Sequence, residues 1–177
     1  MLHEEVVVES VEYLVKPEVY NELYREEQYV KYKCLLELAG ILRGLVLDAG
    51  CGTGLLYEYL EKTGVKGFRY VCMDPSHDML SIAKSRVNSP IALLLESCAE
   101  DIPTRNSTFN YVFSVSTWGV ISDKAKALRE LKRVTGPQGL LVITGYPNTF
   151  TVKPPDLDPS FTEVMRCIDY FYTIRIK

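Results

Sequence analysis

The chain has 177 residues and a mass of 20.1 kDa, a size that suits one domain with a sizeable hydrophobic core. Hydrophobic residues make up 47% and charged residues 24%, which is typical of a globular protein, and no apolar run is long enough to span a bilayer. The formal net charge of −3 provides no general attraction to nucleic acid or acidic lipid.

The cysteines lie far apart in the sequence, without a C-x-x-C pair and without pairing with the two histidines. We therefore expect reduced, mostly buried thiols and no zinc site. The first residues, Met1 to Glu5, are acidic and lack the basic start of a signal peptide. Together these features predict a cytoplasmic protein that is neither secreted nor held in a membrane.

Residues 1–44 are predicted to form a helical lead-in that acts as a lid. We expect residues 1–16 to be extended or partly helical. From Pro17, which suits a first helical turn, leucines and tyrosines recur every three or four positions. We expect this helical stretch to break near residues 26–28 into two helices, the second of which ends at Gly40 or Gly44.

Strands and helices are predicted to alternate from residue 45 to residue 145. Helices are expected over 55–62, from Ser76 onwards and after Ser122 or Asp123, and a turn at 136–139. Continuous apolar runs predict buried strands at 45–47, 68–73, 91–95, 111–115 and 140–144. The alternation predicts a three-layer, Rossmann-like α/β sandwich with a doubly wound, mostly parallel sheet.

The last residues, 146–177, are predicted to form a shortened C-terminal segment of the same single domain, which spans 1–177. A proline-rich connection leads into residues 161–168 and 170–176, which we expect to close the sheet as an antiparallel hairpin. The residues at the turn, Asp169 and Tyr170, have weak turn chemistry. One helical turn followed by a single strand is therefore the alternative.

A glycine-rich loop, Gly50-x-Gly52-x-Gly54, joins the first predicted strand to a helix. Glycines allow backbone to approach a ligand closely, and the open amides of a helix start favour a negative group. Dinucleotide-binding loops read G-x-G-x-x-G, one residue longer, and Asp48 before the first glycine would repel a pyrophosphate. Asp74 ends the next strand, where a carboxylate accepts the hydroxyls of a ribose. A ribose with an amino-acid moiety indicates S-adenosylmethionine.

The motifs resemble those of class I S-adenosylmethionine-dependent methyltransferases with a core of the methyltransferase-11/25 type. Residues 46–54, Val-Leu-Asp-Ala-Gly-Cys-Gly-Thr-Gly, resemble the first motif of that family closely. Residues 73–80 resemble its ribose motif, and residues 99–112 resemble the segment that meets the adenine. Residues 128–139 are similar to its last helix and turn. The resemblance covers roughly residues 20 to 145 and implies the fold described above.

The resemblance also implies roles for individual residues. Gly50 and Gly52 would hold the amino-acid end of the cofactor, with Asp48 near its ammonium group, directly or through water. Asp74 would take the ribose hydroxyls and Pro75 would pack on the adenine. The cofactor-binding residues expected in this way are Tyr24, Gln28, Asp48, Ala49, Gly50, Cys51, Gly52, Gly54, Asp74, Pro75, Met79, Cys98, Ala99, Glu100 and Ser114.

Other parts of the site are expected to touch the adenine or the methyl group. Ala99 would offer its amide to the adenine, and residues 114–117 would form the floor beneath the methyl group. Tyr24, Gln28 or Tyr29 would close over the site. Cys98 stands where the family often has an Asp that binds the adenine amino group, so Glu100 would supply that hydrogen bond or the bond would be weaker or missing.

No catalytic acid or base is assigned. The residues after the fourth strand, Trp118 to Ile121, replace an apolar-His pattern of the family, and Trp118 is either a core residue or a contact to substrate. Methyl transfer from a sulfonium is an in-line displacement that mainly requires donor and acceptor to be held in line, so such a group is optional. The expected product is S-adenosylhomocysteine.

The expected acceptor is a small molecule. The N-P-P-Y-type motif of enzymes that methylate DNA amino groups is absent after the fourth strand, where Ser-Val-Ser-Thr stands at 114–117. RNA or protein remains an alternative acceptor. Two other classes stay open: a catalytically silent cofactor-binding subunit of a methyltransferase complex, and a nicotinamide-dependent oxidoreductase, which the glycine spacing and Asp48 disfavour.

Overall fold

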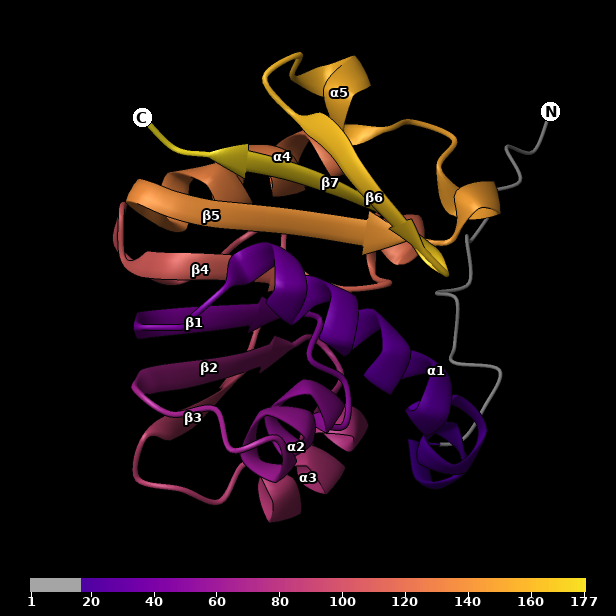
Figure 1. Cartoon of the computed structure of the whole chain (residues 1–177), viewed down its shortest axis with the longest axis vertical. Helices are drawn as coiled ribbons and strands as arrows, with labels where there is room; N and C mark the ends of the chain where they lie inside the picture. Colours follow the sequence, from indigo (N-terminus) through magenta and orange to yellow (C-terminus); the bar gives the residue numbers. More distant parts are fainter. Residues whose placement is uncertain (1–16) are drawn as a thin grey trace, which may run out of the picture.

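A computed structural model describes residues 17–177, and the predicted lead-in at 1–16 lies outside the described residues. The described chain forms one seven-stranded sheet with the order β3-β2-β1-β4-β5-β7-β6 (Figure 1). β1 to β5 are parallel to one another, whereas β7 is antiparallel to both β5 and β6. The strands are β1 (Gly44–Ala49), β2 (Phe68–Asp74), β3 (Ala92–Glu96), β4 (Phe109–Ser114), β5 (Thr135–Gly145), β6 (Thr162–Cys167) and β7 (Asp169–Arg175).

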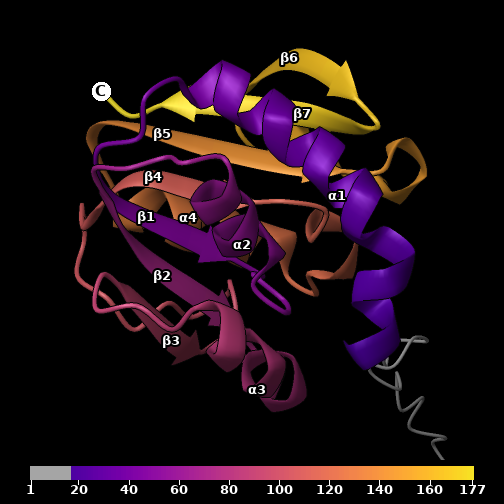
Figure 2. The ribbon, with the colours of Figure 1, turned by 60° about the horizontal axis from the view of Figure 1, so that its bottom comes forward.

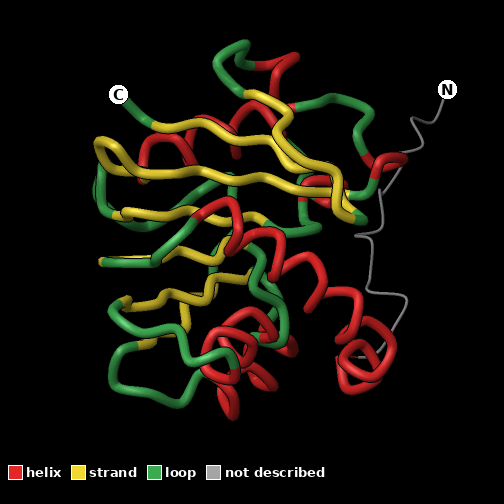
Figure 3. Tube along the Cα trace, in the orientation of Figure 1, coloured by secondary structure: helices red, strands yellow, loops and turns green. Residues whose placement is uncertain are grey.

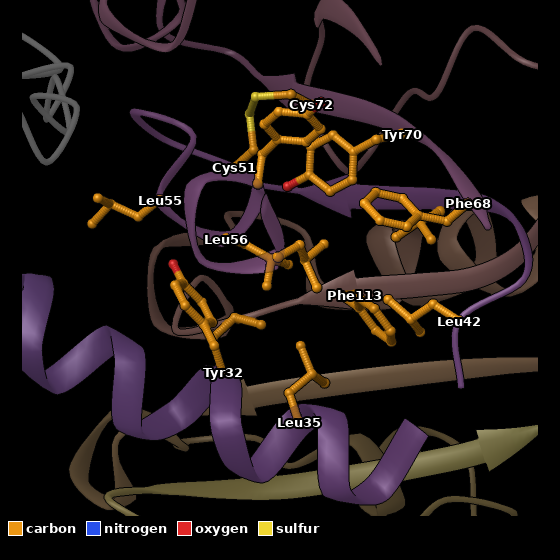
Figure 4. Close-up of a cluster of buried hydrophobic side chains, with 14 of the residues drawn as sticks. Tyr32, Leu35, Leu42, Cys51, Leu55, Leu56, Phe68, Tyr70, Cys72 and Phe113 are labelled. Atoms are coloured by element: carbon orange, nitrogen blue, oxygen red, sulfur yellow. A yellow bond between two sulfur atoms is a disulfide. The ribbon is translucent and has the colours of Figure 1, made fainter. Parts of the chain in front are cut away.

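Helices cover both faces of the sheet, which confirms the predicted three-layer sandwich. α1 (Pro17–Ala39), α2 (Leu55–Lys62) and α3 (His77–Arg86) lie on one face, and α4 (Lys124–Val134) lies on the other (Figure 2). The strands are apolar on both sides because each face of the sheet packs against one of these helical layers, as in a doubly wound sheet. Two hydrophobic clusters form the core, one under α1 to α3 (Figure 4) and one under α4.

The N-terminal helix is continuous, so the expected break near residues 26–28 is wrong. The polar residues there resembled an exposed junction, but Gln28 is buried, and Glu27 forms an ion pair with Lys31 one turn later. Partners elsewhere in the fold thus allow polar residues to continue the helix into its apolar part, where Tyr32 and Leu35 enter the core.

The C-terminal segment forms the expected hairpin and completes the sheet. The turn falls one residue earlier than expected, at Ile168, whose φ of 63° lies in the left-handed region. Between β5 and the hairpin the chain is mostly loop (Figure 3), with the short helices η2 (Pro147–Thr149) and α5 (Pro154–Leu157). The expected turn at 136–139 is instead the irregular start of β5, where the register against β4 shifts.

The expectation of reduced cysteines is wrong for four of the five. Cys34 on α1 is bonded to Cys167 at the end of β6, and Cys51 after β1 is bonded to Cys72 in β2. Cys98 is a free thiol. Sequence separations of 133 and 21 residues concealed both pairs, which only the packing brings together. Paired cysteines remove the support that reduced thiols gave to a cytoplasmic location. None of the described helices is long and apolar enough to cross a membrane.

Candidate functional site

A cavity of about 370 Å³ opens at the carboxyl ends of four neighbouring parallel strands, β3, β2, β1 and β4. The strand order reverses between β1 and β4, which is where ligands bind in open α/β sheets. This volume lies in the range of small-molecule sites. Its lining comes from the ends of these strands and from the loops that follow them: Ala49, Gly50, Asp74, Pro75, Ser97, Cys98, Ala99, Glu100, Thr117, Val120, Ile121 and Ser122.

The glycine-rich loop curls over the end of β2 at one side of this cavity. The amides of Gly50 and Cys51 both donate to the Met73 carbonyl, at 2.7 and 3.0 Å. Gly50 has a φ of 87°, and a Cβ there would lie 2.2 Å from the Thr117 methyl group. Glycine is therefore required at position 50, both for the backbone conformation and for the close approach of the loop after β4.

Asp74, at the end of β2, joins the glycine-rich loop to the cavity lining. One carboxylate oxygen accepts from the Gly52 amide at 2.8 Å and the other from the Ser76 amide at 2.9 Å. Burial raises the pKa of Asp74, and these two amide donors counteract part of that rise. Each carboxylate oxygen has more than one lone pair. Asp74 can therefore hold the loop and still accept hydroxyl groups from a ligand.

Asp48 lies below the loop and is not among the residues that line the cavity. The residue is 3% exposed, and its carboxylate accepts a hydrogen bond from the Tyr70 hydroxyl. Burial raises the pKa of Asp48 to about 7, the Tyr70 bond lowers it, and nearby Asp74 adds to the rise. Beside it, the disulfide of Cys51 and Cys72 attaches the loop to β2 (Figure 4).

The opposite wall of the cavity is formed by the loops after β3 and β4. The Glu100 carboxylate accepts from the amides of Ser122 and Asp123, at 3.1 and 3.3 Å, and so joins the two loops. Cys98 and Ala99 line the cavity beside it. The apolar side chains of Val120 and Ile121 complete this wall. The sequence analysis did not single them out, because an apolar pair before a helix gives no sign of ligand contact.

Several residues expected at the site are not among those that line the cavity. Met79 is buried, Gly54 caps the N-terminus of α2, and the Ser114 hydroxyl is bonded to Thr117. On α1, Gln28 is buried and the Tyr29 hydroxyl donates to Glu58 of α2. The further expected residues that do not line it are Tyr24, Asp48, Cys51 and Gly52.

Trp118 is a core residue, which decides between its two expected roles. Its ring is completely buried in the cluster under α4, and the indole nitrogen donates to the Val152 carbonyl at 2.7 Å. The side chain thus ties the loop after β4 to the connection beyond β5.

The charges of the cavity argue for one kind of ligand. Two carboxylates, Asp74 and Glu100, lie in the lining, and among the described residues there none is Lys or Arg. A pyrophosphate would meet repulsion here, whereas ribose hydroxyls and a cationic sulfonium suit acidic, hydrogen-bond-accepting walls. The residues present therefore fit S-adenosylmethionine better than a dinucleotide.

Comparison with known proteins agrees with this fit. A sequence profile described as a methyltransferase domain matches residues 47–143, more than half of the chain. MJ1252 of Methanocaldococcus jannaschii is 30% identical over 141 residues, which are 76% of this chain and 49% of that protein. UbiE of Campylobacter jejuni, a ubiquinone/menaquinone biosynthesis C-methyltransferase, is 29% identical over 57% of this chain and 44% of its own length. The chain thus spans about half the length of these curated relatives.

Solved structures share the fold over most of the chain. A SAM-dependent methyltransferase from Aquifex aeolicus superposes with a TM-score of 0.70 and 22% identity, over 90% of this chain and 97% of its own. The fold is therefore that of the class I S-adenosylmethionine-dependent methyltransferases. The chain belongs to the methyltransferase-domain family, whose methyl-donating cofactor is S-adenosylmethionine.

Proposed function

We propose that the chain binds S-adenosylmethionine in this cavity and transfers its methyl group to a small-molecule acceptor. The observation that carries the proposal is the contact between the Gly52 amide and Asp74. It supports the proposal because it joins the glycine-rich loop to Asp74, which lines a cavity whose described lining lacks a cationic side chain. When bound, the cofactor supplies the methyl group on its sulfonium.

The chain's own residues would bind and orient. In the proposal, the Gly50 to Gly52 backbone holds the amino-acid end and Asp74 accepts the ribose hydroxyls. The apolar side chains of Pro75, Ala99 and Ile121 flank the adenine of the cofactor. Asp48 lies below the glycine-rich loop and, when it is ionised, adds a negative potential to this part of the proposed site.

A small acceptor is supported by the names of distant relatives. UbiE of Campylobacter jejuni is named for quinone biosynthesis, and a protein of Hamiltonella defensa, 32% identical over 62% of this chain, is a malonyl-[acyl-carrier protein] O-methyltransferase. In the proposal the chain acts as one domain, with residues 45–145 holding the cofactor and residues 1–44 covering the site. RNA, protein or no acceptor at all are the competing outcomes.

Titration calorimetry with S-adenosylmethionine, S-adenosylhomocysteine and NADH tests the cofactor. The variant Asp74→Asn should weaken binding of both sulfur nucleosides by about 1–3 kcal/mol, the value of hydrogen bonds to a charged group. Asp78→Asn is the matched control, because Asp78 is an exposed carboxylate one turn further along the chain. Tight binding of NADH alone would refute the proposal.

Transfer of label from methyl-labelled S-adenosylmethionine to an extract, followed by separation of small molecules, RNA and protein, tests the acceptor. Label in the small-molecule fraction is expected. Label in RNA or protein would replace the acceptor class, and cofactor binding without any transfer would favour a silent subunit.

A further inference from the structure

A buried polar cluster lies where the middle of α1 meets the carboxyl ends of β4 and β5. It consists of side chains from four parts of the chain that are far apart in sequence. We name it the Lys31 cluster, and its members are Glu27 and Lys31 of α1, Ser116 after β4, Thr144 and Tyr146 at the end of β5, and Asp169 at the start of β7.

The ammonium group of Lys31 is the centre of this cluster. Its side chain is fully buried and lies 2.7 Å from a Glu27 carboxylate oxygen and 3.0 Å from an Asp169 oxygen. It also donates to the Ser116 hydroxyl at 3.0 Å and lies 3.9 Å from the centre of the Tyr146 ring. The ammonium therefore donates one hydrogen bond, to Ser116, and lies within ion-pair distance of two carboxylates, whereas Asp169 Oδ1 has no hydrogen-bond partner among the described residues.

Ser116 contacts three other members of the cluster. Its hydroxyl accepts from Lys31 and donates to Asp169 at 2.7 Å, while its amide donates to the Thr144 hydroxyl at 2.9 Å. Its φ is 59°, a left-handed conformation that is unfavourable for a residue with a side chain. These three hydrogen bonds stabilise a backbone conformation that is otherwise unfavourable for serine.

The neighbour of Ser116 reaches the cofactor cavity. Thr117 lines the cavity, and its methyl group lies so close to Gly50 that only glycine fits there. Its hydroxyl is bonded to Ser114 on the other side of Ser116. A continuous series of contacts thus leads from α1 through Lys31, Ser116 and Thr117 to the glycine-rich loop.

Stability alone is a weak explanation for a buried ammonium. Removing charged groups from water costs much of what their attraction returns, and apolar replacements of buried ion pairs are often neutral or stabilising. α1 is already attached to the C-terminal hairpin by the disulfide of Cys34 and Cys167. The specific feature of Lys31 is its hydrogen bond to Ser116. The backbone of Ser116 has a left-handed conformation, and the next residue, Thr117, lines the cavity.

We propose that Lys31 is a positioning residue, which sets the conformation of residues 114–118 and thereby couples the seating of α1 to cofactor binding. The inference rests on the proposed function, since it assigns S-adenosylmethionine to the cavity beside Thr117. In return, cofactor binding stabilises the seating of α1, because coupling between two sites is reciprocal.

The test uses four variants of the full chain. Lys31→Met removes the ammonium and keeps the length of the side chain, and Lys33→Met is the matched control on the exposed side of the same helix. Because Lys31→Met leaves the fully buried Asp169 without its cation, the third variant combines Lys31→Met with Asp169→Asn, which removes both charges of this buried pair and leaves only the partly exposed Glu27. Ser116→Ala breaks the series of contacts at its other end.

Two measurements are made on each variant that remains folded. Amide hydrogen exchange without ligand reports on the peptide that spans 114–121, and calorimetry reports the affinity for S-adenosylhomocysteine. We expect faster exchange in this peptide and roughly tenfold weaker binding, within the usual range of coupling between sites, in all variants except Lys33→Met. Exchange in β1 to β3 should stay as in the wild type.

The double variant of Lys31 and Asp169 separates positioning from stability. If Lys31 only stabilises the fold, this variant regains the exchange rates and the affinity of the wild type once its unfolding temperature returns to normal, and the inference is overturned. Unchanged exchange at 114–121 in Ser116→Ala would also overturn it. A wild-type chain that binds neither sulfur nucleoside would refute the proposed function, whereas the exchange measurement would still decide whether Lys31 controls this segment.

Discussion

Replacement of Asp48 by Asn is expected to stabilise the folded chain at neutral and alkaline pH. Asp48 is almost completely buried, and the Tyr70 hydroxyl bonds to its carboxylate. An Asn side chain has nearly the same shape, and its carbonyl oxygen can accept the same bond. The substitution therefore removes the charge and leaves the packing and this hydrogen bond in place.

The expected gain follows from the pKa of Asp48. Burial raises it from 3.8 to about 7, so the folded chain holds a proton that the unfolded chain has lost between these two values. The free energy of unfolding consequently falls as the pH rises from 4 to 7. The difference of roughly three pKa units corresponds to about 4 kcal/mol, which Asp48→Asn should recover above pH 7 and not below pH 4.

Urea unfolding at a series of pH values from 4 to 8.5 measures this effect. The difference between the variant and the wild type is the informative quantity, because all other titrating groups are common to both. Asp78→Asn, at an exposed position, should show no such trend. A constant difference across the series would refute the reasoning, since it would mean that Asp48 has the same pKa in the folded and unfolded chains.

Two further predictions concern the disulfides and the loop. Replacing Cys34 and Cys167 by Ser should lower the free energy of unfolding by about 5 kcal/mol, and replacing Cys51 and Cys72 by about 3, because the first pair closes the longer loop. Urea unfolding of the two variants checks this order, and equal losses would contradict it. Gly52→Ala should cost only about 1 kcal/mol in stability, since open space surrounds a Cβ there and its φ is 53°. Its affinity for S-adenosylhomocysteine should fall roughly tenfold, which calorimetry measures. Normal binding would mean that no ligand approaches this glycine.

Much of the fold could be predicted because its signals are local. Apolar runs, helical periodicity and capping residues such as Ser76 and Asp123 are set by neighbours within a few positions, and they place α2, α3, α4 and the parallel strands within a few residues. The end of a strand also follows from such a run. Gly50 and Asp74 were therefore placed correctly at one edge of the sheet.

The side-chain partners could not be predicted in this way. Polar residues near Glu27 suggested a helix break, but a carboxylate or an ammonium can remain in a helix when a distant element pairs with it. Lys31 forms an ion pair with Asp169, which is 138 positions further along the chain, and Cys34 forms a disulfide with Cys167. The conformation of each of these segments depends on a contact that no local pattern contains.

The class of the protein could be predicted from local patterns alone: an alternating α/β domain with a glycine-rich loop and a following Asp at the edge of the sheet where the cofactor is expected. The environment of each charge depended on how the chain packs. This packing placed Asp48 under the loop beside Tyr70 and buried Lys31 against Ser116. The reason is physical, because periodicity and turn chemistry act over a few residues, whereas burial, pKa and disulfide pairing depend on which distant segments the sheet brings together.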